Sequence, residues 1–313
     1  MVDSNTHNIS FKVQVIITSI LECPKDNMSS MNFASENPRD SIQTLSTSLA
    51  GIAISVSSAL FSLVGSLLII YLILKSTMGL KTAYHRIMFS ISICDVLQSC
   101  AIALATLPMP KDMIYEFDGL ALGNHRTCNL QGFTIVLAAV MTVILNASLC
   151  IFYFFTIVRR WPEKKYRKII EPAMYIFAVL FSSYIAITGL LTKQFNPNPL
   201  RFTWCAYSQY PYWCVDEDCE EEHGNPEGAL VHFNMANLMV VACVLIVIIS
   251  MITITLHVYK QEKLLQRYVT NTNSLSNRRL VTFRSNLVNT KLIVKQALFY
   301  TLAFLFMMHH PLL

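Results

Sequence analysis

Charged residues are scarce in this sequence, and their scarcity indicates the solvent around most of the chain. Only 14% of the 313 residues are Asp, Glu, Lys or Arg, whereas soluble chains carry about 25%. Hydrophobic residues make up 54% of the sequence. A soluble protein with so few charges could not cover its own surface, so we expect lipid to surround much of this chain.

Charges are absent from five long stretches, and a sixth stretch, 87–110, contains only Asp95. About 20 apolar residues are enough to cross the hydrocarbon core of a bilayer. The pattern predicts an all-α membrane protein whose bundle domain covers residues 47–313. Six transmembrane helices are expected, at about 47–74, 87–109, 128–158, 172–192, 229–259 and 294–313.

Motifs of enzymes and metal proteins are missing as well. The sequence contains no Gly-rich phosphate loop, zinc-ligand spacing or nucleophile elbow. The adjacent His309 and His310 would point about 100° apart on a helix, so they could not share one face. We therefore predict no enzyme activity, no cofactor and no metal site. The net charge of +5 comes from basic residues beside the helix ends, which favours anionic lipid over nucleic acid as their partner.

Basic residues concentrate in alternate loops. Of the 24 Lys and Arg residues, three lie in the connection 75–86 and six in the connection 159–171. Eight more lie in the connection 260–293 and the two residues after it, up to Lys295. Lys and Arg accumulate on the cytosolic side of membrane proteins. These three loops are therefore predicted to be cytosolic.

The opposite side is predicted to be extracellular. It comprises the tail 1–46 and the outer loops 110–127 and 193–228. The tail carries glycosylation sequons at Asn8 and Asn27. Five of the nine cysteines fall on this side, where disulfides form, and their odd number leaves at least one unpaired. The five are Cys23, Cys128, Cys205, Cys214 and Cys219.

Several motifs together point to a known family. Cys128 opens the predicted third helix, the second outer loop contains "TWCAYSQYPYWC", and the second helix carries one acid in "SISICDV". The sixth helix begins "KLIVKQALFYTLAF" and reaches Pro311. With an outer N-terminus, these features resemble the seven-helix G-protein-coupled receptors, both rhodopsin-like and cyclic-AMP-receptor-like, over about residues 47–313. The Asp-Arg-Tyr motif of rhodopsin-like members is absent from the corresponding "CIFYFFTIVRRW".

A seventh apolar stretch is missing too. The sequence ends at Leu313, inside the last predicted helix. We expect a G-protein-coupled-receptor-like helical bundle without its seventh helix, and therefore an incomplete sequence. A genuine six-helix protein is the alternative.

The resemblance implies a receptor of the plasma membrane with an unknown extracellular ligand and a heterotrimeric G protein as partners. It also implies a disulfide between Cys128 and Cys205, with Cys214 as the rival partner of Cys128. The G-protein face would include Arg159, Arg160, Lys164 and Lys165. Candidates for the ligand pocket are Gln131, Thr134 and His232.

Asp95 is the strongest single candidate for a functional residue. An ionisable side chain at mid-membrane costs about 2.5–3.5 kcal/mol on insertion scales, which makes it a functional hypothesis. In the resembling family, an acid at this place binds sodium or joins a polar network. The expected polar neighbours on the third helix are Thr142, Asn146 and Ser148.

An alternative function is a small polytopic transporter or channel component that uses Asp95 as a coupling residue. Transporters often contain repeated halves and broken helices, and the sequence shows no internal repeat. Ser58, Ser62 and Ser66 recur every four residues on the first predicted helix. This stripe of small residues predicts close helix packing.

Overall fold

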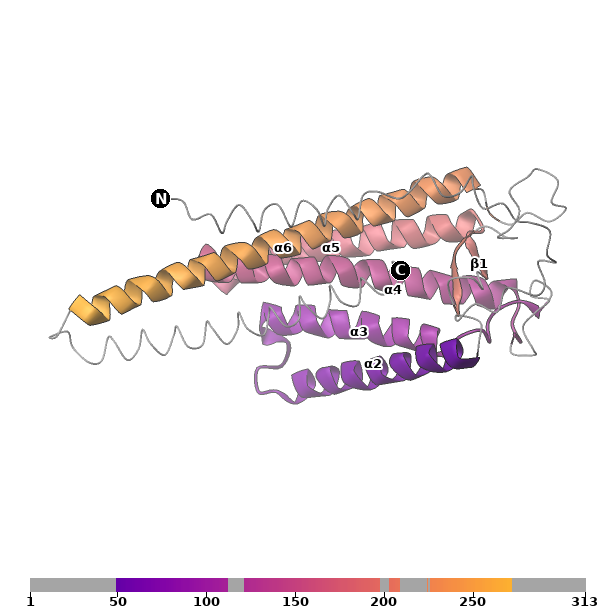
Figure 1. Ribbon diagram of the computed structural model, residues 1–313, viewed down its shortest axis with the longest axis horizontal. Coiled ribbons are helices and arrows are strands. Elements are labelled where there is room, and N and C mark those ends of the chain that lie inside the picture. Colours follow the sequence, from indigo (N-terminus) through magenta and orange to yellow (C-terminus); the bar gives the residue numbers. More distant parts are fainter. Residues whose placement is uncertain (1–48, 112–120, 198–202, 209–223, 225, 272–313) are drawn as a thin grey trace, which may run out of the picture. The chain divides into compact units, whose positions relative to one another are not determined.

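The structure is a computed structural model that describes residues 49–111, 121–197, 203–208, 224 and 226–271. Five long helices account for most of these residues (Figure 1). The sixth predicted helix, 294–313, and the predicted tail, 1–46, lie outside the described residues. The five helices are α2 (Leu49–Lys75), α3 (Ala83–Ala103), α4 (His125–Tyr153), α5 (Glu163–Leu191) and α6 (Pro226–Asn271).

Each of the five helices contains a stretch that is long and apolar enough to cross a membrane. Large apolar side chains face outward on them: Phe61 is 81% exposed, Leu191 75% and Leu238 71%. In water, such side chains would be unfavourable by about 25 cal/mol for each Å² of apolar surface. In lipid these exposed apolar side chains have apolar surroundings and carry no such cost. The chain is therefore a multi-pass membrane protein.

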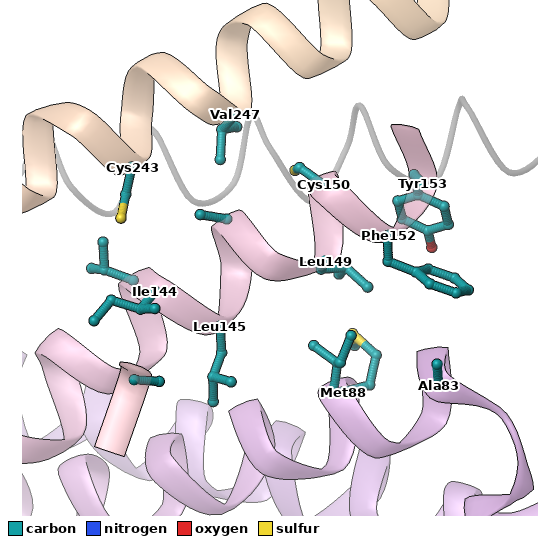
Figure 2. Close-up of a cluster of buried hydrophobic side chains, with 14 of the residues drawn as sticks. Ala83, Met88, Ile144, Leu145, Leu149, Cys150, Phe152, Tyr153, Cys243 and Val247 are labelled. Atoms are coloured by element: carbon teal, nitrogen blue, oxygen red, sulfur yellow. The ribbon is translucent and has the colours of Figure 1, made fainter. Parts of the chain in front are cut away.

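α4 is the central helix of this arrangement. It packs against α3, α5 and α6, whereas α2 packs against α3. Its spanning segment is 61% buried, against 17% for that of α2. Figure 2 shows Ile144 and Leu145 of α4 between Met88 of α3 and Cys243 and Val247 of α6. The buried core is therefore built around one helix.

Two short strands and a π-helix complete the described elements that bear on function. β1 (Phe195–Pro197) and β2 (Cys205–Tyr207) form an antiparallel hairpin. The π-helix η4 (Phe154–Val158) continues α4 at its other end, and the short 3-10 helix η2 (Gly79–Lys81) precedes α3. We call the side of the bundle with β1 and β2 the hairpin end, and the side with η2 and η4 the basic end.

The helix starts are set by local capping. Asn124 accepts a hydrogen bond from the backbone N–H of Thr127 at 3.0 Å, and the Thr127 hydroxyl accepts one from the Asn124 N–H at 2.8 Å. This reciprocal capping satisfies backbone donors at the start of α4. The Thr82 hydroxyl similarly accepts from the His85 N–H at 3.3 Å at the start of α3.

α5 and α6 extend furthest beyond their charge-free stretches. α5 begins at Glu163, whereas the sequence predicted a start near residue 172, because Lys, Arg and Glu are good helix formers and continue the helix outside the hydrocarbon. α6 has 46 residues and so measures about 69 Å at 1.5 Å per residue. It is therefore much longer than the roughly 30 Å of hydrocarbon that it has to cross.

Candidate functional site

The hairpin is covalently attached to α4. Cys128, in the first turn of α4, is disulfide-bonded to Cys205 of β2, with the two Cα atoms 5.5 Å apart. This is the pair that the family resemblance implied. The rival partner, Cys214, lies outside the described residues, as do Cys23 and Cys219.

Gln131 strengthens the same attachment through its side-chain amide. Its Nε2 donates to the carbonyl oxygens of Ala101 and Ala105, both at 2.9 Å. Its Oε1 accepts from the backbone N–H of Cys205 at 3.0 Å. The side chain is only 3% exposed. Gln131 was predicted to line a ligand pocket. In the structure, both ends of its amide bond to the protein itself and join α4 to the end of α3 and to β2.

Two glycines let the hairpin lie directly on the helices. A Cβ atom at Gly132 of α4 would lie 2.6 Å from the ring of Phe195, and one at Gly189 of α5 would lie 2.6 Å from the ring of Tyr207. The two rings stand edge to face, with centroids 5.4 Å apart. Burial raises the pKa of the Tyr207 phenol above its ordinary value. A side chain at either glycine would therefore force the facing ring or the backbone to shift.

Two other predicted pocket residues remain untested. The Thr134 hydroxyl donates to the carbonyl of Leu130 in its own helix at 2.8 Å. His232 belongs to α6, but its side chain lies outside the described part of the protein.

In the middle of the bundle, Asp95 of α3 faces α2. The Ser62 hydroxyl donates to Asp95 Oδ2 at 2.9 Å, and the Ser66 hydroxyl donates to the same oxygen. The two serines are one helical turn apart, so both reach the carboxylate from one face of α2. The serine stripe was predicted to serve packing alone. In the structure it also supplies hydrogen bonds to the acid.

The polar residues predicted beside Asp95 bond within α4. The Asn146 amide donates to the Thr142 carbonyl at 3.0 Å, and the Ser148 hydroxyl donates to the Ile144 carbonyl at 2.9 Å. The hydroxyl oxygen of Thr142 is buried and has no hydrogen-bond partner in the described structure. None of the three side chains is hydrogen-bonded to Asp95 in the described residues.

At the basic end, Arg86 of α3 is bound to Glu171 of α5. Its Nε donates to Glu171 Oε1 at 2.6 Å and its Nη2 to Oε2 at 2.7 Å. The remaining Nη1 donates to the carbonyls of Leu80 and Lys81 at 2.9 and 3.0 Å. The sequence analysis had assigned both charged residues to loops. Their opposite charges near the starts of two helices were the available signal.

A second acid of α5 also binds α3. Glu163 Oε1 accepts from the backbone N–H of Ala83, the first residue of α3, at 2.6 Å. A carboxylate at this position satisfies a free helix donor and complements the helix dipole. Farther along, the hydroxyls of Ser90 and Tyr175 are hydrogen-bonded at 3.1 Å. Both acids in the first turns of α5 therefore point toward α3.

The connection from α4 to α5 is folded compactly. The backbone N–H of Trp161 donates to the Phe155 carbonyl at 3.0 Å, and the two rings lie 4.6 Å apart. The ammonium of Lys165 stands 4.0 Å from the centroid of the Trp161 ring, a cation–π contact. The four basic residues predicted for the G-protein face are all exposed: Arg159, Arg160, Lys164 and Lys165.

No family model and no curated protein matches the sequence. Among solved structures, the crystal structure of squid rhodopsin matches with a TM-score of 0.54 and 16% sequence identity. The match covers 81% of this chain. The chain has a rhodopsin-like fold. The predicted G-protein-coupled-receptor-like bundle is therefore confirmed as a fold.

This chain and squid rhodopsin share a fold although their sequences have little in common. The chain spans 63% of the length of the squid rhodopsin chain. At 16% identity the likeness concerns the arrangement of helices and not the residues that bind ligands or partners. In the described residues, no group of three or more His, Cys, Asp or Glu side chains could hold a metal ion.

Proposed function

We propose that this protein is a G-protein-coupled-receptor-like signalling protein of the plasma membrane. The observation that carries the proposal is the rhodopsin-like fold, with a TM-score of 0.54 to squid rhodopsin. In this proposal the hairpin end and the N-terminus face outside, and the basic end faces the cytosol. The excess of Lys and Arg at the basic end supports this orientation.

Signalling in this proposal is a shift between arrangements of helices. A ligand that binds the hairpin end better in one arrangement raises the population of that arrangement. The basic end then presents the change to a heterotrimeric G protein. The exposed residues Arg159 and Arg160, directly after η4, are the proposed contacts, together with Lys164 and Lys165 of α5.

Association with G proteins tests the function directly. The full chain in nanodiscs would be mixed with purified heterotrimeric G proteins of the stimulatory, inhibitory and phospholipase-coupled classes, with and without a non-hydrolysable GTP analogue. We expect one class to bind and the analogue to release it. Arg159→Gln with Arg160→Gln should weaken that binding, and Arg126→Gln, an exposed cation at the hairpin end, should not. If no class binds in a GTP-sensitive way, the proposal fails.

Orientation has a separate test. Epitope tags near residue 3, near Ser276 and after Leu313 would be probed in intact and permeabilised cells. The first and third tags should be accessible from outside, and the tag near Ser276 only after permeabilisation. Modification of Asn8 or Asn27 by glycans would agree with this orientation, whereas an outside tag at Ser276 would reverse it.

A further inference from the structure

The turn between η4 and α5 is strained at one residue. Arg160 has a backbone φ of 51°, in the left-handed region that a residue with a Cβ atom seldom adopts. This residue belongs to the segment that carries the four proposed G-protein contacts. Strained backbone persists only where surrounding contacts hold it, and it clusters at functional sites. The contacts that hold this turn therefore bear on how the four cations are presented.

The helix just before the turn is irregular as well. In η4 the backbone N–H of Arg159 donates to the carbonyl of Phe154, five residues earlier, at 3.3 Å. A continued α-helix would bring this N–H to the carbonyl of Phe155, four residues earlier. In the structure that carbonyl accepts the backbone N–H of Trp161 at 3.0 Å. Trp161 thus uses the acceptor that a regular helix would need, so the π-helix and the strained turn belong to one arrangement.

The side chain of Trp161 makes two contacts that support this arrangement. Its ring lies 4.6 Å from the ring of Phe155, measured between centroids. Phe155 is in turn 6.5 Å from the ring of Tyr166, which is almost fully buried. The ammonium of Lys165 stands 4.0 Å from the centroid of the Trp161 ring, a cation–π contact. One side chain therefore connects the core, the strained turn and one of the proposed contacts.

We propose that Trp161 is the positioning residue of the G-protein contacts. Its ring keeps Arg160 in the left-handed conformation, fixes the direction of Arg159 after η4, and orients Lys165. Without the ring, the turn relaxes to negative φ and the α-helical bonding pattern extends past Phe154. Arg159 then rotates by about 100° around the helix axis, the angle of one residue. This inference rests on the proposed function and adds the residue that sets the geometry of its contacts.

Hydrogen exchange tests the hold of the ring without any G protein. The full chain in nanodiscs would be compared with Trp161→Ala and Trp161→Phe by mass spectrometry with residue-level fragmentation. Residue 161 keeps its backbone N–H in both variants, so the exchange of this amide reports whether the ring holds the turn. After correction for intrinsic rates, we expect about fivefold faster exchange in Trp161→Ala and nearly unchanged exchange in Trp161→Phe. Equal rates in all three chains would overturn the proposal.

Amides in the first turns of α4 are the internal control for that experiment. They lie at the hairpin end, far along the helix from Trp161, and should exchange at the same rate in all three chains. An equal acceleration at both ends of α4 in Trp161→Ala would show a general loosening of the bundle. That result would overturn a positioning role for the ring.

Glycine substitutions at two neighbouring residues test the strain. Glycine adopts positive φ without steric cost, so Arg160→Gly should slow exchange of the residue 161 amide by about threefold. Arg159 has a φ of −84° and a ψ of −12°, which place no demand for glycine on this position. Arg159→Gly therefore removes the same charge without relieving strain and should not slow exchange. Slower exchange in both variants, or in neither, would overturn the proposal.

G-protein association separates this inference from the proposed function. Trp161→Ala retains all four cations, yet its GTP-sensitive binding should weaken by up to about fivefold, because apparent affinity falls with the competent fraction. Trp161→Phe should recover most of the binding. Full binding by Trp161→Ala would overturn the positioning role even if exchange is faster. If the unaltered chain binds no class of G protein, the proposed function fails, whereas the exchange rates still decide whether Trp161 holds the turn.

Discussion

The guanidinium of Arg86 and the carboxylate of Glu171 meet side by side, through one pair of atoms at 2.6 Å and a second at 2.7 Å. Such bidentate, charge-assisted pairs are about twice as strong as neutral hydrogen bonds and fix direction as well. The pair joins α3 to α5, two helices that otherwise meet mainly through α4. It therefore closes a triangle of helices at the basic end.

Removing one partner of this pair should destabilise the bundle. In Arg86→Ala, the Glu171 side chain, 8% exposed, is left without its partner. Loss of one member of a buried ion pair costs about 3–5 kcal/mol. Because the Arg86 guanidinium is partly exposed, we expect a loss of unfolding free energy near about 3 kcal/mol. Thermal unfolding in detergent would measure the change. Lys81→Ala, at an exposed cation on the same end, is the control.

Reversing the pair separates its charge from its packing. Arg86→Glu combined with Glu171→Arg should be more stable than either single change, because the double variant restores opposite charges. A double variant no better than the worse single variant would show that the two side chains do not act as a pair.

A methyl group at Gly132 should loosen the hairpin. In Gly132→Ala the new Cβ would lie 2.6 Å from the Phe195 ring, so the ring or the helix must move. Overpacking of this kind costs about 1–3 kcal/mol. Gly65→Ala is the matched control, since a Cβ there meets nothing within 4 Å. The unfolding temperatures of the two variants should differ clearly, and equal values would contradict the packing described here.

Loss of the disulfide should be costly as well. The bond links residues 77 apart in sequence, and removing a native disulfide typically costs about 2–5 kcal/mol. Cys128→Ser, Cys205→Ser and the double variant should therefore unfold at lower temperature, and all three by similar amounts. Peptide mapping without reduction should recover a Cys128–Cys205 peptide from the unaltered chain. A Cys128–Cys214 peptide would contradict this connectivity.

The fold should tolerate a substitution of Asp95 that removes the charge but keeps a hydrogen-bond acceptor. It should not tolerate one that removes the acceptor. In Asp95→Asn the amide oxygen can still accept from Ser62 and Ser66, so we expect no loss of folded yield. Asp95→Leu leaves both hydroxyls without this acceptor and should lower the yield, since a lost hydrogen bond costs about 0.5–1.5 kcal/mol. Monodispersity after solubilisation is the measure. A large loss with Asn would mean that the ionised carboxylate itself is required.

The spanning helices could be predicted because lipid leaves little choice. A chain crossing a bilayer must satisfy its backbone hydrogen bonds internally, so charge-free stretches of sufficient length become helices, as in α2 and α4. The Cys128–Cys205 bond came from the family resemblance, and the sequence alone left Cys214 open. The sequence did not indicate the start of α5 at Glu163, because helix propensity continues past the apolar boundary.

Side-chain partners between helices were harder to foresee. The serine stripe of α2 predicted a packing face but not the residue that it would meet, so the bonds from Ser62 and Ser66 to Asp95 were missed. The partners Arg86 and Glu171 are 85 residues apart. Their pairing depends on how α3 and α5 are rotated about their axes, which periodicity does not determine in lipid-facing helices.

The double attachment of the hairpin to α4 has a mechanical consequence. The disulfide at Cys128 and the amide of Gln131 fasten β2 to the first two turns of the helix. From His125 to Val158 the helical segment runs for 34 residues, or about 51 Å. A pull or twist applied to the hairpin therefore acts directly on α4, whose far end continues into the π-helix η4 beside Arg159. The α-helical hydrogen-bonding pattern continues from the covalent anchor to Tyr153, and the change to a π-helix at Phe154 is the first break in it.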